Sequence, residues 1–116
     1  MNYRLNYADT QSDSLSDARS RERELLLRSI QLMKDAQAEG GEAKAVIEAV
    51  HFASRLWTVF LDDLSSPDNA LPGKVRAGLI SIGIWMLRDL ESIRDGKTSD
   101  FANLIEITEI VRDGLF

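Results

Sequence analysis

Helix-breaking residues are confined to a few short segments of this chain, and their positions limit its fold more than any other feature. Its two prolines, Pro67 and Pro72, lie close together near the middle of the sequence. Most of the glycines stand where a helix would end: Gly40, Gly41, Gly73, Gly96 and Gly114. Between these points apolar residues recur at helical spacings, with no sustained alternation of the strand type. The pattern predicts a chain made of helices joined by short turns.

The predicted helices cover about residues 14–39, 42–64, 72–94 and 100–113. Ser14, with Asp17 one helical turn later, fits a capping box, which marks the start of a helix. We therefore expect residues 1–13 to form a short flexible N-terminal arm and residues 14–116 to form one helical domain. A chain of 116 residues with 44% hydrophobic residues can bury a modest core without disulfide bonds. The expected fold is all-α, a compact single domain of about four helices arranged like a bundle.

The second and third predicted helices each carry two apolar stripes. In residues 42–64 the first stripe is Val46, Val50, Ala53, Trp57, Phe60, Leu61 and Leu64, and the second is Ala45, Ala49, Phe52, Leu56 and Val59. In residues 72–94 the stripes are Val75, Leu79, Ile82, Met86, Leu90 and Ile93, and Ile80, Ile84 and Leu87. A helix with this much apolar surface is either central in a bundle or keeps one side for an amphipathic helix of another protein. The periodicity alone leaves both alternatives open.

Charge and motif content argue against several classes of function. The chain has 14 Lys and Arg against 19 Asp and Glu, a net charge of −5, whereas nucleic-acid binders usually carry a basic surface. The absence of Cys excludes a disulfide scaffold, a thiolate metal site and a cysteine nucleophile. Glu48 and His51 have the Glu-x-x-His spacing of di-iron bundles, but that chemistry needs a second pair and the chain has one His. We expect no enzymatic activity, no cofactor and no metal.

The hydropathy of the chain predicts a cytoplasmic location. The N-terminal residues are polar and acidic and contain no apolar core of the kind found in signal peptides. The most apolar stretch, Leu79 to Leu87, is interrupted by Ser81 and Gly83 and is about half the length needed to span a bilayer. We therefore expect a soluble protein that does not insert into membranes.

Three blocks of sequence give the chain a family resemblance. The first is Arg55-Leu56-Trp57-Thr58-Val59-Phe60. The second is Pro67-Asp68-Asn69-Ala70-Leu71-Pro72, followed by a helix with Leu79-Ile80-Ser81-Ile82-Gly83-Ile84-Trp85. The third is Leu104-Ile105-Glu106-Ile107 with Arg112-Asp113-Gly114-Leu115. In this order and over nearly the whole chain, the blocks resemble the FlaF family of flagellar regulators from alphaproteobacteria.

The resemblance implies a role in flagellum assembly. FlaF-like proteins promote the production and export of flagellin, work against the repressor FlbT, and are thought to bind flagellin as secretion chaperones. A small acidic helical protein with a spare apolar stripe is suited to cover an amphipathic terminal helix of flagellin before export. The predicted binding surface combines the outer stripes of both apolar helices with a polar anchor at the rim: Phe52, Arg55, Leu56, Val59, Ile80, Ile84 and Leu87. Trp57 lies on the first stripe and is predicted to belong to the core.

Two alternatives remain at the level of sequence. The protein acts as a post-transcriptional regulator of flagellin expression, through FlbT or through flagellin mRNA; its net negative charge argues against direct contact with RNA. Or it forms a homodimer that hides the second apolar stripe against a second copy.

Overall fold

The computed structural model describes residues 3–38 and 42–115, with side chains from Asp17 onward in the first helix. The described residues form four helices: α1 (Tyr3–Ala38), α2 (Ala43–Ser65), α3 (Gly73–Arg94) and α4 (Ala102–Leu115). No strand occurs among these residues. The predicted all-α, bundle-like fold is confirmed.

The ends of α2, α3 and α4 lie within about two residues of the predicted ones, which is the ordinary uncertainty of a helix boundary. The start of α1 was predicted wrongly: the helix begins at Tyr3 and not at Ser14. Residues 3–13 contain neither Pro nor Gly, so nothing in this segment interrupts a helix that runs through the expected capping box. The predicted cap at Gly40 and Gly41 lies outside the described residues.

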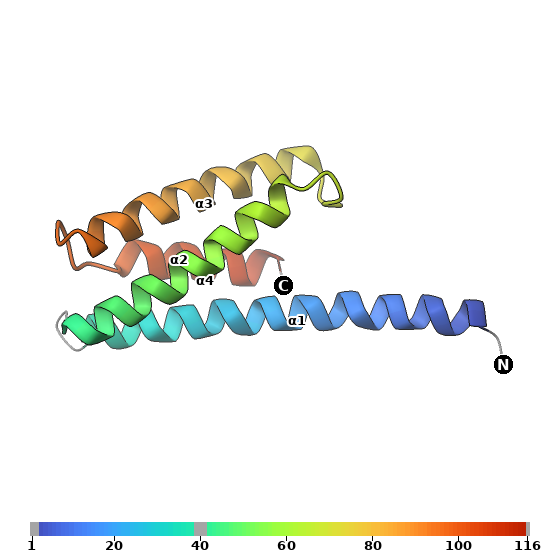
Figure 1. Ribbon diagram of the computed structural model, residues 1–116, viewed down its shortest axis with the longest axis horizontal. Helices are drawn as coiled ribbons and strands as arrows, with labels where there is room; N and C mark the ends of the chain where they lie inside the picture. Colours follow the sequence, from blue (N-terminus) through green and yellow to red (C-terminus); the bar gives the residue numbers. More distant parts are fainter. Residues whose placement is uncertain (1–2, 39–41, 116) are drawn as a thin grey trace.

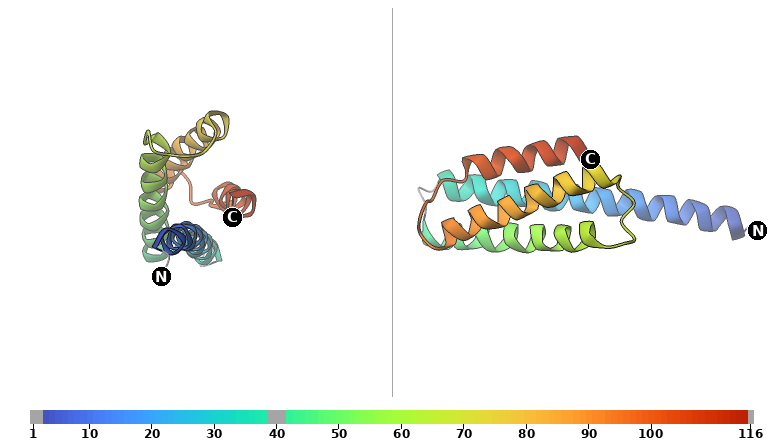
Figure 2. Two further views of the ribbon diagram at one scale, coloured as in Figure 1. Left: turned by 90° about the vertical axis from the view of Figure 1, so that its right-hand side faces the viewer. Right: turned by 90° about the horizontal axis from the view of Figure 1, so that it is seen from above.

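The helices are arranged in chain order around one core. α2 packs against both α1 and α3. α4, the fourth helix in sequence, packs against α1 (Figures 1 and 2). The N-terminal part of α1 extends past the ends of the other three helices (Figure 1). The molecule is correspondingly elongated, with extents of 58 × 27 × 19 Å.

The core takes side chains from all four helices. Its largest fully buried members are Leu26, Met33, Trp57, Met86, Leu90, Phe101 and Leu104. Trp57 is 1% exposed, as predicted, and its ring meets Phe60 edge to face with centroids 5.6 Å apart. α3 approaches α2 closely at Gly83, where an added Cβ would stand 2.8 Å from Cδ2 of Leu61. A glycine therefore allows the two helices to meet at this point.

Side-chain hydrogen bonds fix both described loops. In the α2–α3 loop, Nδ2 of Asn69 donates to the main-chain oxygen and to Oδ2 of Asp63, both at 3.2 Å. Oδ1 of Asn69 accepts from the Leu71 amide at 3.0 Å. Ahead of α4, Oε1 of Gln37 in α1 accepts from the Phe101 amide at 2.8 Å, and its Nε2 donates to Oδ1 of Asp100 at 3.0 Å. α1 thus caps the start of α4.

Candidate partner-binding groove

A groove runs between α1 and α2 and has a volume of about 510 Å³. α1 contributes two residues to its lining and α2 the other seven: Glu22, Leu25, His51, Phe52, Arg55, Leu56, Val59, Phe60 and Asp63. We call this hollow the α1–α2 groove. Its walls are mainly aliphatic and aromatic, with charged side chains among them, which is the usual composition of a site that binds an amphipathic helix.

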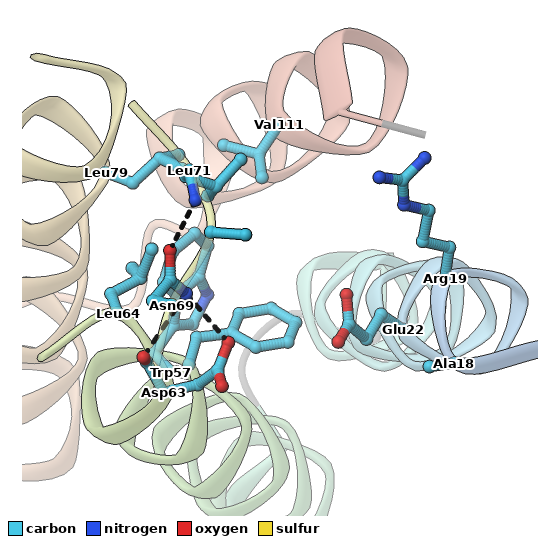
Figure 3. A pocket seen from close by; sticks show the side chains of 12 residues that line it. Ala18, Arg19, Glu22, Trp57, Asp63, Leu64, Asn69, Leu71, Leu79 and Val111 are labelled. Carbon is cyan, nitrogen blue, oxygen red and sulfur yellow. Dashed lines mark hydrogen bonds between the residues drawn. The ribbon is translucent and has the colours of Figure 1, made fainter. Parts of the chain in front are cut away.

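A second hollow of about 390 Å³ lies where the α2–α3 loop crosses the end of the bundle (Figure 3). We call it the end pocket. It takes residues from all four helices and from the loop: Ala18, Arg19, Glu22, Trp57, Phe60, Asp63, Leu64, Asn69, Ala70, Leu71, Leu79 and Val111. Glu22, Phe60 and Asp63 line both hollows, so the groove and the pocket adjoin along these three residues.

The structure brings together the α2 half of the predicted binding surface. Phe52, Arg55, Leu56 and Val59 all line the α1–α2 groove. Val59 is 61% exposed and Arg55 is exposed, so both are available at the edge of the groove. Leu56 is only 6% exposed and belongs to the core cluster, so its first role is packing.

The α3 half of that surface lies elsewhere. Ile80, Ile84 and Leu87 line neither the groove nor the end pocket. Ile84 is 43% exposed, Ile80 is half-buried, and Leu87 is half-buried against the core cluster. The sequence predicts these positions as apolar, but it does not tell which neighbouring helix each of them faces.

Two carboxylates stand at the boundary between the groove and the end pocket. Glu22 points from α1 toward the cavity, and Asp63 comes from the last turn of α2 (Figure 3). Among the residues with described side chains, neither carboxylate has a cationic partner at ion-pair distance. Burial, together with the negative charge of Asp63, raises the pKa of Glu22 above its ordinary value, while Arg19 and Arg21 oppose the shift.

A buried donor is unpaired on the wall of the end pocket. Trp57 lines the pocket next to Asn69 (Figure 3), and its Nε1 has no hydrogen-bond partner among the described residues. Leaving a buried donor unpaired costs about 1–3 kcal/mol. Relief of this cost requires an oxygen acceptor within hydrogen-bond distance of Nε1.

Sequence reasoning missed the residues that α1 and the loop contribute. Glu22 and Asp63 are far apart in sequence, and no sequence signal pairs them. Asn69 and Leu71 had a signal, since both belong to the Pro67–Pro72 block that carries the family resemblance. Among the described residues, no three side chains of the metal-ligating types converge, and no helix is long and apolar enough to cross a membrane.

Comparison with known proteins places the whole described chain in one family. The family model described as flagellar protein FlaF matches residues 3–115. A search of curated proteins and a search of solved structures found no significant match. The family match spans α1 to α4 and therefore includes the groove, the end pocket and the loop between α2 and α3. The chain belongs to the FlaF family of flagellar proteins.

Proposed function

We propose that this protein is a flagellum assembly factor that binds unassembled flagellin and promotes its synthesis and export. The observation that carries the proposal is the α1–α2 groove, an apolar hollow of about 510 Å³ on a protein of a flagellar family. Its exposed aliphatic edge at Val59 is suited to the apolar face of an amphipathic helix, such as a terminal helix of flagellin. Binding there would keep that face away from water until export.

A few apolar side chains of the partner helix would supply most of the binding free energy in such a groove. Burying one Val, Leu or Phe side chain completely contributes about 1.5–3 kcal/mol. Two or three anchors of a partner helix, seated beside Phe52 and Val59, would therefore contribute about 3–9 kcal/mol before the entropic cost of association is subtracted. Arg55, exposed on the same side of α2, would interact with polar groups at the edge of that helix.

The test is calorimetric titration of the protein with monomeric flagellin, with Val59→Asp as the groove variant. A carboxylate at this edge must be desolvated on binding, so we expect the affinity to fall at least about tenfold. Ile47→Asp is the matched control, because Ile47 is 68% exposed on the same helix and does not line the groove. Both exposed sites should accept Asp without unfolding, whereas Leu56→Asp would place a charge in the core.

Ile84→Asp tests the α3 half of the proposed surface in the same titration. A loss of affinity with Ile84→Asp would extend the site onto α3, and unchanged affinity would limit it to the α1–α2 groove. Equal effects of Val59→Asp and Ile47→Asp would refute the groove as the site.

Absence of flagellin binding would refute the proposed function and make FlbT or flagellin mRNA the next partner to test. RNA binding would weaken steeply with added salt, whereas binding in an apolar groove would change little. Sedimentation of the free protein would show whether a homodimer covers the groove.

A further inference from the structure

The α1–α2 groove and the end pocket share three lining residues, and two of these, Glu22 and Asp63, are carboxylates. Two apolar hollows of about 510 and 390 Å³ meet at the carboxylates of Glu22 and Asp63. A partner that filled both hollows would pass directly over these two side chains. Whatever it placed there would have to suit the two negative charges of Glu22 and Asp63, with Arg19 on the wall of the end pocket nearby.

We propose that the combined site recognises an amphipathic helix with a Lys or Arg side chain between two apolar anchors. One anchor fills the α1–α2 groove, the other enters the end pocket, and the cation lies between Glu22 and Asp63. The proposal rests on the proposed function, because it specifies the kind of helix that the groove accepts.

Charge complementarity supports this occupant. Glu22 is half-buried, and within the described part of the chain neither Glu22 nor Asp63 forms an ion pair. An approaching cation would therefore gain two carboxylates without breaking an existing ion pair among the described residues. The repulsion between the two carboxylates, which contributes to the raised pKa of Glu22, would be relieved by the same contact.

The unpaired indole N–H of Trp57 is a second and independent observation. Trp57 is 1% exposed and lines the end pocket, and its Nε1 is sealed from water and has no hydrogen-bond partner among the described residues. A peptide helix end carries free carbonyl oxygens, so a helix end that widened the end pocket on binding would bring an acceptor to this donor. An occupant made only of hydrocarbon would leave this donor unpaired.

The experiment uses two synthetic amphipathic helical peptides that differ at one position. Both carry apolar anchors on either side of the centre; one has Lys at the central position and the other has Gln. Calorimetric titration of the full chain at low salt should show that the Lys peptide binds about fivefold to tenfold more tightly. Glu22→Gln should remove most of this preference, and added salt should reduce it.

Glu24→Gln is the matched control variant. It removes the same charge from the same helix, two positions away, and Glu24 is exposed and lines neither hollow. The preference for Lys should therefore survive in this variant. Equal binding of both peptides to the wild type, equal loss of preference in both variants, or no binding of either peptide up to millimolar concentration would overturn the proposal.

The same variants separate this inference from the proposed function. If flagellin binds and Glu22→Gln leaves its affinity unchanged, the flagellin proposal stands and the cation site is refuted. If the wild type prefers the Lys peptide but flagellin does not bind, the cation site stands and the partner is another basic amphipathic helix.

Discussion

Glu22 is half-buried, and its ionisation affects the stability of the fold. Burial and the nearby Asp63 raise its pKa, so the folded protein binds this proton more tightly than the unfolded chain does. The contribution of the protonated form to stability is therefore present at acid pH and is lost as pH rises from the ordinary pKa of Glu through the raised value. At neutral pH the ionised side chain lowers the free energy of unfolding.

Glu22→Gln should consequently raise the urea midpoint at neutral pH, because it replaces a partly desolvated charge by a neutral amide. The difference from the wild type should shrink as pH falls below the ordinary range of a glutamate, where Glu22 is protonated in both states. Urea titrations at a series of pH values would measure this. Glu24→Gln, at an exposed site, should leave the free energy of unfolding at neutral pH within about 0.5 kcal/mol of the wild-type value. A Glu22→Gln variant less stable than the wild type at neutral pH would contradict the raised pKa of Glu22.

At the scale of the helices, one side chain of α1 helps to hold the start of α4. Gln37 makes two hydrogen bonds to the segment that opens α4, at 2.8 Å to the Phe101 amide and 3.0 Å to Asp100. Gln37→Ala leaves the Phe101 amide without this acceptor and should lower the free energy of unfolding by about 1 kcal/mol. Gln31→Ala is the control, since the described hydrogen bond of the Gln31 side chain goes to Asp35 on its own helix. Equal effects of the two variants on the urea midpoint would argue against the cap.

The two glycines inside α3 should respond to alanine with opposite signs. A Cβ at Gly78 meets nothing within 4 Å, so Gly78→Ala should stabilise the protein by about 0.5–1 kcal/mol through helix propensity. A Cβ at Gly83 would stand 2.8 Å from Leu61, so the cost of overpacking should exceed the same gain by about 1 kcal/mol or more. Thermal or urea unfolding would compare the two variants. A Gly83→Ala protein as stable as Gly78→Ala would mean that α2 and α3 adjust freely.

The sequence was sufficient to predict the bounds of those helices whose ends are marked by a Pro or Gly. Pro72 precedes α3 and Gly96, with a φ of +78°, follows it, so both boundaries could be read from single residues. The start of α1 could not be predicted in this way. Ser14 fits a capping box, but no Pro or Gly precedes it to stop the helix from extending back to Tyr3. The Gln37 cap could not be predicted either, since its partners are 63 and 64 residues away along the chain.

For the whole molecule, the limit of prediction is the pairing of helix faces. The two apolar stripes of α2 were visible in the sequence, and one of them does border the groove through Phe52 and Val59. The α3 stripe was predicted to complete the same surface, but the other wall of the groove comes from Glu22 and Leu25 of α1. Which stripe meets which helix depends on how the three helices cross in space. The spacing of apolar residues in one sequence does not specify these crossing angles.

The packing of α4 on α1 also has a consequence for synthesis. α2 can begin to pack against α1 as soon as both have left the ribosome, but the part of α1 that α4 covers has no partner until α4 itself emerges. Phe101 and Leu104, fully buried in the folded protein, are supplied only when this part of the chain emerges. The nascent chain therefore carries exposed apolar surface on α1 until α4 has emerged, and its core closes only then.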